Sequence, residues 1–381
     1  MNWIPGNREP RSTFPAYPRK NGPLDGWARS RMNTKRKIAL TVFLLVAGVF
    51  WAALTGCEIY VFQGIFEQKF ILPDQVETLK TSGEEKLDQD DIEGALADFN
   101  AAQRLAPQDA SILTWRGMAY SKKEAYDLAI QDFTDAIRLD PTDASNYRWR
   151  GSSYVHQDKL AEAFKDYDKA IELDATEADT FSLRGYAHWK NKELDQAIAD
   201  YSEALKLDAS DTNSFSSRGE IYLAKGDYAK AVEDFDEALR FNGDNDESHL
   251  NRGTAHSRLG NWEKARNDFD EAVRLDTDSA ANQNARAWLL ATCPKAAIRN
   301  GPESVTGATK ACELSKWKES SYIDTLAAAY AEIGDFVSAV KYQQQAVDKT
   351  EDQPKFESLR KELQEHLALY QQKQAYREVV K

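Results

Sequence analysis

A period of 34 residues runs through this chain and restricts its fold more than any other feature. The dipeptide Arg-Gly recurs at residues 116–117, 150–151, 184–185, 218–219 and 252–253, and Arg286-Ala287 continues the series. Alanine recurs with the same step at 95, 129, 163, 197, 231 and 265, and Phe or Tyr follows each alanine four residues later. A fixed step of this length indicates one supersecondary unit whose copies bury their faces by stacking.

Each unit is expected to contain two helices that cross closely. In residues 144–177, Gly151 and Tyr154 fall on one helical stripe, and Ala163 and Tyr167 fall on a second one. We expect the small residues to mark the crossing and the aromatic residues to fill the space beside it. The structural glycines of the repeat are then Gly83, Gly117, Gly151, Gly185, Gly219 and Gly253.

A 34-residue unit with Gly, an aromatic residue, Ala, a second aromatic residue, Ala and a closing Pro resembles the tetratricopeptide repeat, or TPR. The resemblance implies an all-α fold, namely a right-handed α-solenoid of stacked helix–turn–helix units. Residues 76–353 would hold eight TPR-like units, which begin near residues 76, 110, 144, 178, 212, 246, 280 and 320. Residues 354–381 would form a capping helix and tail, and the stretch 354–378 reads as helical.

The seventh unit departs from the pattern. It is about 40 residues long, and we expect an extra loop around Pro294–Pro302. The runs Ala287–Pro294 and Thr309–Leu314 look like a variant that occurs near the end of some bacterial arrays.

Two charged residues repeat with the same period. Aspartate recurs at 98, 132, 166, 200, 234 and 268, and arginine recurs at 116, 150, 184, 218, 252 and 286. Pairing each aspartate with the arginine 18 residues later uses all twelve residues, whereas pairing within a unit leaves Asp98 and Arg286 over. We therefore predict ion pairs that join the second helix of each unit to the first helix of the next. The alternative is two sets of charges that are solvated independently.

The N-terminal part of the chain differs from the repeats in charge. Residues 1–37 carry nine basic and two acidic residues, while the rest carries 40 basic and 60 acidic ones. An acidic body repels phosphate backbones, so we expect the repeats not to bind nucleic acid. Residues 1–37 are expected to be a disordered basic segment whose charge favours contact with anionic membrane lipid.

Residues 38–57 contain no charged residue and are long enough, as a helix, to cross a bilayer. A basic run precedes this stretch and Glu58 follows it. The positive-inside rule then predicts a single-pass transmembrane helix, with residues 1–37 in the cytoplasm and the repeats on the non-cytoplasmic side of a bacterial cell envelope. Residues 58–75 would link the span to the repeats. A buried core helix and a reversed orientation are the alternatives.

The sequence Leu54-Thr55-Gly56-Cys57 supports a second interpretation, because it looks like the lipobox of bacterial lipoproteins. Counted from Met32, the chain has the layout of a short secretory signal, with a charged start, an apolar middle and small residues before Cys57. Cys57 would then carry lipid, and the residues before it would be removed. The apolar residues that follow Cys57 argue against this interpretation, and both interpretations put the repeats outside the cytoplasm.

In arrays that resemble this one, the first helices of the units line a concave groove. Position relative to the repeat glycines selects candidate peptide-binding residues that are basic or aromatic: Lys122, Arg148, His156, Tyr186, Trp189, Lys190 and Arg258. The middle of the acidic array is thus locally basic and aromatic, which favours a protein or peptide ligand with acidic and aromatic residues. The alternative is that these are ordinary exposed side chains.

The sequence contains no motif of a catalytic or cofactor site. The five histidines form no metal-ligand spacing, the three cysteines lack CxxC, and GxSxG, HExxH and a phosphate loop are absent. We therefore predict a non-catalytic, membrane-anchored scaffold or adaptor without a cofactor. The alternatives are an envelope lipoprotein that recruits a peptidase or assembly machinery, and an enzyme whose pocket is built from distant residues.

Overall fold

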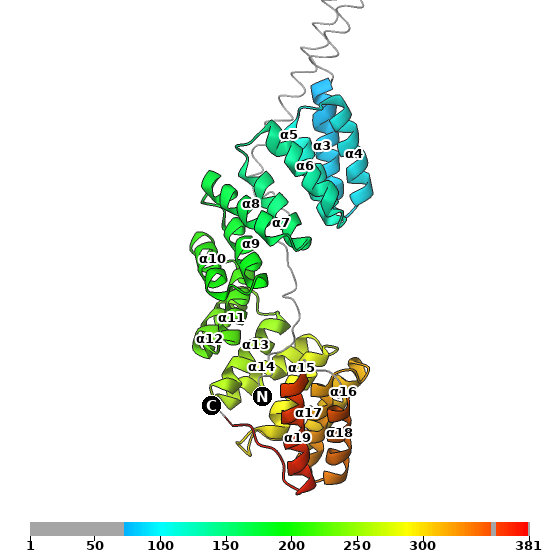
Figure 1. Ribbon diagram of the computed structural model, residues 1–381, viewed down its shortest axis with the longest axis vertical. Coiled ribbons are helices and arrows are strands. Elements are labelled where there is room, and N and C mark those ends of the chain that lie inside the picture. The colour runs from blue at the N-terminus through cyan, green and yellow to red at the C-terminus, as the bar shows by residue number, and fades with distance from the viewer. Residues whose placement is uncertain (1–71, 352–355, 380–381) are drawn as a thin grey trace, which may run out of the picture. The chain divides into compact units, whose positions relative to one another are not determined.

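The computed structural model describes residues 72–351 and 356–379, and within them it contains 17 α-helices and no strand (Figure 1). The predicted all-α fold is thereby confirmed. The helices are α3 (Leu72–Asp88), α4 (Ile92–Leu105), α5 (Ala110–Lys122), α6 (Tyr126–Leu139), α7 (Ala144–His156), α8 (Leu160–Leu173), α9 (Ala178–Lys190), α10 (Leu194–Leu207), α11 (Thr212–Lys225), α12 (Tyr228–Phe241), α13 (Asp246–Arg258), α14 (Trp262–Leu275), α15 (Ala280–Thr292), α16 (Gly301–Leu314), α17 (Ser320–Glu332), α18 (Phe336–Asp348) and α19 (Glu357–Gln371).

The predicted membrane segment and Cys57 lie outside the described residues. Among the helices that are described, none combines the length and the apolar composition that crossing a bilayer requires.

The helices belong to two compact bodies, which divide between Ala187 and His188, inside α9. In the first body, α3 pairs with α4, α5 with α6 and α7 with α8, and each pair packs on the next. In the second body, the pairs are α11 with α12, α13 with α14, α15 with α16 and α17 with α18, and α19 packs on α18. This stacking of consecutive pairs buries faces that a single pair would leave open, as in a TPR solenoid.

Repeated turn and cap signals set the ends of the helices. Between pairs, an aspartate commonly caps the next first helix: Asp143 accepts a hydrogen bond from the Ser145 backbone at 2.9 Å. Within a pair, one residue of the turn adopts the left-handed region, which reverses the chain after the first helix. These residues are Asp90, Glu124, Asp158, Lys192, Gly226, Gly260 and Gly334.

The two helices of a pair meet most closely where the repeat glycine faces an aromatic ring of the second helix. A Cβ atom added to Gly117 would lie 2.8 Å from the Phe133 ring, and one added to Gly253 would lie 2.7 Å from the Phe269 ring. These distances are below van der Waals contact, so a larger side chain would push the helices apart. The same contact occurs at Gly83, Gly151 and Gly219.

The seventh pair has a longer connection than the others, as the sequence indicated. Residues 293–300 lie between α15 and α16, and the loop is tied back by a hydrogen bond from Asn300 N to Leu290 O of 2.9 Å. Pro302 was expected in this loop but lies in the first turn of α16. Proline fits there because the first helical residues need no amide donor.

The last helix is shorter than the stretch 354–378 that reads as helical, because α19 ends at Gln371. Lys373 follows in the left-handed region with φ 59°, and the residues after it are not helical. The buried side of α19 consists of Leu363, His366 and Tyr370. The segment after α19, residues 374–379, therefore has its own path over the second body.

The repeated ion pairs connect different helices from those predicted. Arg116 donates from Nε and Nη2 to Asp132 at 2.7 and 2.6 Å, and both residues belong to the pair of α5 and α6. The prediction that Arg116 pairs with Asp98 is therefore wrong, and Ser82 and Lys86 hold Asp98 instead, each at 2.6 Å. The same contact within a pair occurs for Arg150–Asp166, Arg218–Asp234 and Arg252–Asp268.

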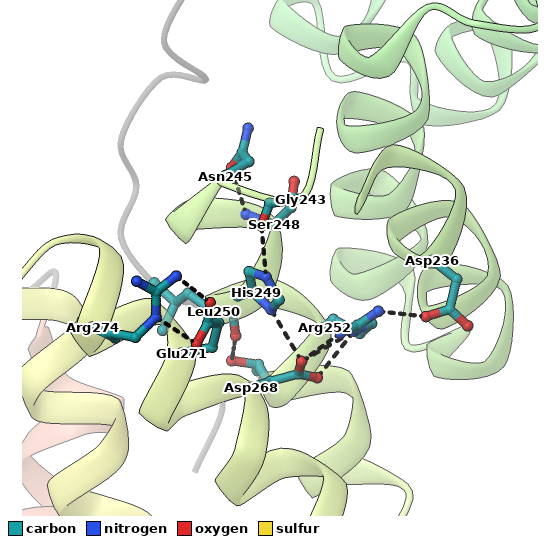
Figure 2. Close-up of polar contacts among 11 residues, drawn as sticks. Asp236, Gly243, Asn245, Ser248, His249, Leu250, Arg252, Asp268, Glu271 and Arg274 are labelled. Carbon is teal, nitrogen blue, oxygen red and sulfur yellow. Dashed lines mark hydrogen bonds and ion pairs between the residues drawn. The ribbon is translucent and has the colours of Figure 1, made fainter. Parts of the chain in front are cut away.

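The remaining nitrogen of each arginine does reach the preceding helix pair. Arg116 Nη1 donates to Asn100 at 2.9 Å, and Arg252 Nη1 donates to Asp236 at 2.7 Å (Figure 2). The acceptor lies two residues after the repeat aspartate of that pair, and it varies between amide, hydroxyl and carboxylate. The other acceptors are Thr134 for Arg150, Asp168 for Arg184 and Ser202 for Arg218.

Burial and bonding set the protonation of the buried aspartates. Burial raises the pKa of Asp132, and the hydrogen bonds from Arg116 oppose this effect without reversing it. Burial acts in the same direction on Asp268, but His249 and Arg252 together outweigh it and lower the pKa of Asp268. Figure 2 shows both partners converging on Asp268, with His249 Nδ1 3.2 Å from its Oδ1.

The two halves of the arginine contact predict different costs of substitution. Asp234 is 4% exposed, so Asp234→Ala leaves the Arg218 cation without its buried partner and is expected to cost about 3–5 kcal/mol. Ser202→Ala removes a hydrogen bond between pairs and is expected to cost about 0.5–1.5 kcal/mol. Urea unfolding followed by far-UV circular dichroism measures both. Equal losses for the two variants would contradict the assignment of the carboxylate to the contact within the pair.

Candidate functional site

The residues predicted to bind a peptide all lie on the first helices of their pairs, and we call the face that these helices form in each body its first-helix surface. They are divided between the bodies. In the first body, Lys122 lies on α5, Arg148 and His156 on α7 and Tyr186 on α9, and in the second body Trp189 and Lys190 lie on α9 and Arg258 on α13. The seven residues are thus not described as one site.

The basic residues of the first body are engaged by carboxylates from neighbouring turns. Lys122 Nζ lies 2.8 Å from Asp90 and donates to the Leu87 carbonyl at 3.0 Å. Arg148 is 11% exposed and donates to Glu177 at 3.0 Å. The excess positive charge expected on this surface is therefore partly neutralised within the chain. Asp90 and Glu177 belong to turns, which the positional rule for first helices did not consider.

The aromatic candidates of the first body have ring or core contacts. The His156 ring stacks on Tyr126 with centroids 4.5 Å apart and planes 5° apart, and so links α7 to α6. Tyr186 packs against the hydrophobic cluster that contains Val155 and Tyr167. Both rings therefore contribute to packing between helices as well as to the surface.

A row of polar side chains that the positional rule did not single out connects successive first helices. Thr114 donates to Asn146 at 2.7 Å, and the hydroxyl groups of Ser121 and Ser153 lie 3.2 Å apart. Asn146 and Ser153 are buried, at 0% and 1% exposed. The signal in the sequence is a polar residue at a first-helix position that faces a polar residue 32 positions away.

The best-defined site of the second body is formed where residues 376–378 cross α13, α15 and α17. The Glu378 backbone donates to the Thr292 carbonyl at 2.9 Å, and Trp288 Nε1 donates to the Glu378 carboxylate at 3.2 Å. Arg258, one of the predicted residues, lies 3.6 Å from the same carboxylate. Arg377 Nη2 donates to Glu332 at 2.6 Å.

Burial changes the acid–base properties of this segment. Burial raises the pKa of the Glu378 carboxyl, while Arg258 and the Trp288 donor act in the opposite direction. Burial also raises the pKa of Tyr376 to about 12. The Tyr376 ring lies between Trp288, at a centroid distance of 5.7 Å, and His366, at 4.3 Å. The segment is thus recognised through one ring and two charged groups.

A buried ion pair anchors α19 beside this site. His366 Nδ1 lies 2.8 Å from Asp324 Oδ1, and the side chains are 6% and 0% exposed. Burial alone would lower the pKa of His366, but the charge and hydrogen bond of Asp324 prevail and raise it. The imidazolium form is therefore favoured in the folded second body.

The described part of the chain offers no group of three or more His, Cys, Asp or Glu residues placed to hold a metal ion. Cys293 and Cys312 are buried free thiols, and burial raises the pKa of Cys312 to about 12. A thiol with so high a pKa is a poor nucleophile at neutral pH. The arrangement supports binding contacts rather than covalent chemistry at these cysteines.

The comparisons with known proteins agree with the helix pairing. Two tetratricopeptide repeat models match residues 81–144 and 246–279, and a TPR repeat model matches residues 151–192, 190–226 and 219–260. No curated protein sequence matches the chain.

Solved structures with the same fold have low sequence identity. Pseudomonas aeruginosa pilF is 17% identical over 57% of this chain and 98% of its own, with a TM-score of 0.52. A TPR repeat-containing protein from Cytophaga hutchinsonii is 16% identical over 64% and 98%, with a TM-score of 0.51. The Cut9–Hcn1 structure of the APC/C is 15% identical over 71% and 52%, with a TM-score of 0.50. At these identities the similarity concerns the fold alone.

The His366–Asp324 pair predicts a pH dependence of stability. A histidine with a raised pKa in the folded chain stabilises the fold fully below its unfolded pKa of about 6.5, and this contribution disappears as the pH rises through the folded pKa. We expect the wild-type chain to lose thermal stability from pH 5.5 to pH 8.5, and His366→Gln to lose less over the same interval. Thermal unfolding at a series of pH values measures this. An equal loss in both proteins would contradict the role of His366.

Proposed function

Because the chain belongs to the tetratricopeptide-repeat family, we propose that it is a non-catalytic scaffold or adaptor that binds proteins or peptides through its first-helix surfaces. One observation carries the proposal. In the second body, residues 376–378 are not helical, and α13, α15 and α17 hold them through a backbone hydrogen bond, ion pairs and ring contacts. These are the contacts by which a groove of helices binds a segment of another protein.

The first body supports a ligand that carries acidic and aromatic residues. Arg148 and Lys122 are paired with Glu177 and Asp90, whose side chains are 51% and 77% exposed. Ion pairs with such exposed carboxylates contribute little stability, so the carboxylates of a ligand can replace them at little cost. The stacked rings of His156 and Tyr126 offer a flat apolar edge beside these cations.

We further propose that the adaptor is held at a membrane, with the repeats on the non-cytoplasmic side of a cell envelope. The support is the uncharged run 38–57, with a basic flank before it and an acidic residue after it. Anchoring would keep the first-helix surfaces near the membrane and raise the local concentration of partners that are held there.

The sequence before Cys57 favours a second form of the same proposal, an envelope lipoprotein that recruits a peptidase or assembly machinery. Mass spectrometry of the mature protein separates the two forms, because a spanning helix retains residues 38–56 and a lipoprotein begins at a lipidated Cys57. We expect an N-terminus before residue 38. A diacylated Cys57 at the N-terminus would contradict the spanning helix.

Site-specific cross-linking tests the binding role. A photo-reactive phenylalanine derivative at Trp189, on the first helix α9, is expected to cross-link a partner in intact cells upon irradiation. The matched control is the same residue at Lys206, which is 70% exposed on the second helix α10. Denaturing gels and peptide mass spectrometry identify the products. Equal products from both positions, or products from Lys206 alone, would contradict binding at the first-helix surface.

A further inference from the structure

Residues 376–378 follow the first-helix surface of the second body in the order α17, α15, α13. Arg377 contacts Glu332 at the end of α17 and the Ala291 carbonyl of α15 at 3.2 Å. Glu378 contacts α15 and then Arg258 at the end of α13. The segment therefore runs across three successive first helices, opposite to their order in the chain (Figure 1).

The contacted positions are equivalent in the repeat. Taking Gly253, Ala287 and Ala327 as equivalent positions, the residues one, four and five later carry the contacts. On α15 these are Trp288, Ala291 and Thr292, and all three contact the segment. On α13 and α17 the fifth residues are Arg258 and Glu332. The contacts thus use the repeat geometry itself rather than an accessory feature.

Each residue of the segment has its own partner set. The aromatic ring of Tyr376 lies against Trp288 and His366, and the guanidinium of Arg377 binds Glu332. The Glu378 carboxylate, whose side chain is 12% exposed, is received by Trp288 and Arg258. The surface therefore distinguishes an aromatic, a basic and an acidic residue in that order.

The fit of the segment is incomplete. A small cavity remains beside Glu378, lined among others by Thr254, Ser257 and Arg258 of α13 and by Trp288 of α15. The Arg377 side chain is 36% exposed, and Val379 is 71% exposed. The segment has no helix or strand of its own, and such segments open locally at a small fraction of the global unfolding free energy.

We propose that residues 376–378 are an intramolecular occupant of a peptide site on α13, α15 and α17, and that this site binds a segment of a partner protein with an aromatic, a basic and an acidic residue in succession. The inference rests on the proposed binding role of the first-helix surface and names its ligand class in the second body. The occupant is connected to α19 by a few residues, so its effective concentration is of the order of millimolar. A partner segment then binds only by displacing it.

Peptide binding to the full-length chain, kept in detergent because of residues 38–57, tests this proposal. The probe is a fluorescein-labelled peptide with the sequence of residues 372–381, and fluorescence anisotropy measures its affinity. The loosened variant Tyr376→Ala/Glu378→Gln carries a weakened occupant, and we expect it to bind the probe at least about tenfold more tightly than the wild-type chain. A probe with the same two substitutions is expected to lose this gain.

Substitutions on the receiving surface locate the site. Arg258→Ala in the loosened variant is expected to weaken probe binding by about tenfold, because it removes the cation that faces Glu378. The matched control is Arg240→Ala, on the second helix α12 with a 59% exposed side chain, which should leave binding unchanged. Arg377→Ala is a milder loosened variant, and it is expected to give a smaller gain in affinity than the double variant.

Two results would overturn the proposal. One is a loosened variant that keeps the wild-type thermal midpoint and binds the probe no better than the wild-type chain, which would make the segment a structural cap. If the double variant does not fold, the absence of any gain in Arg377→Ala has the same meaning. The other is binding that is insensitive to Arg258→Ala. Failure here leaves the cross-linking from Trp189 as an independent measure of the wider binding role.

Discussion

The structure depends on the arginine of each first helix, which contacts two second helices at once. In Arg116, Arg218 and Arg252, Nε and Nη2 hold the buried aspartate of the same pair, and Nη1 holds an acceptor of the preceding pair. The planar guanidinium fixes the angle between these bonds, so the position of one pair determines the position of the next. Because the aspartate is buried, the contact specifies the stacking more than it adds stability.

The aromatic contact with the repeat glycine complements this arrangement on the other side of the helix. The ring of Phe133 or Phe269 lies directly on the glycine, so the helices of a pair pack at a short distance. The helix faces that remain carry the polar row of Thr114, Asn146, Ser121 and Ser153 and the charged residues near the turns. Packing therefore leaves the first-helix surface as the place where side chains vary from unit to unit.

That surface is used differently in the two bodies. In the first body, carboxylates of turns neutralise Lys122 and Arg148, and an acidic ligand is expected to replace them. In the second body, the chain itself supplies an aromatic, a basic and an acidic residue, and the raised pKa of Glu378 records how completely its carboxyl is buried. A partner of the second body therefore has to compete with a segment that is already in place, whereas a partner of the first body has to break exposed ion pairs.

The sequence by itself determined the helical repeat, because a 34-residue step in Gly, Ala and aromatic residues is compatible with few other folds. It also placed the candidate residues on first helices, since helical periodicity fixes the face on which a residue lies. It did not determine the ion pairs: aspartate and arginine recur with one period, so separations of 16 and 18 residues fit the pattern equally well. Counting leftover residues favoured 18, but Ser82 and Lys86 satisfy Asp98, and Asp270 and Glu303 satisfy Arg286. Only the tertiary structure decided between them, and only it showed that Tyr376, Arg377 and Glu378 return to α13, α15 and α17, because contacts between residues about 90 positions apart leave no periodic trace in the sequence.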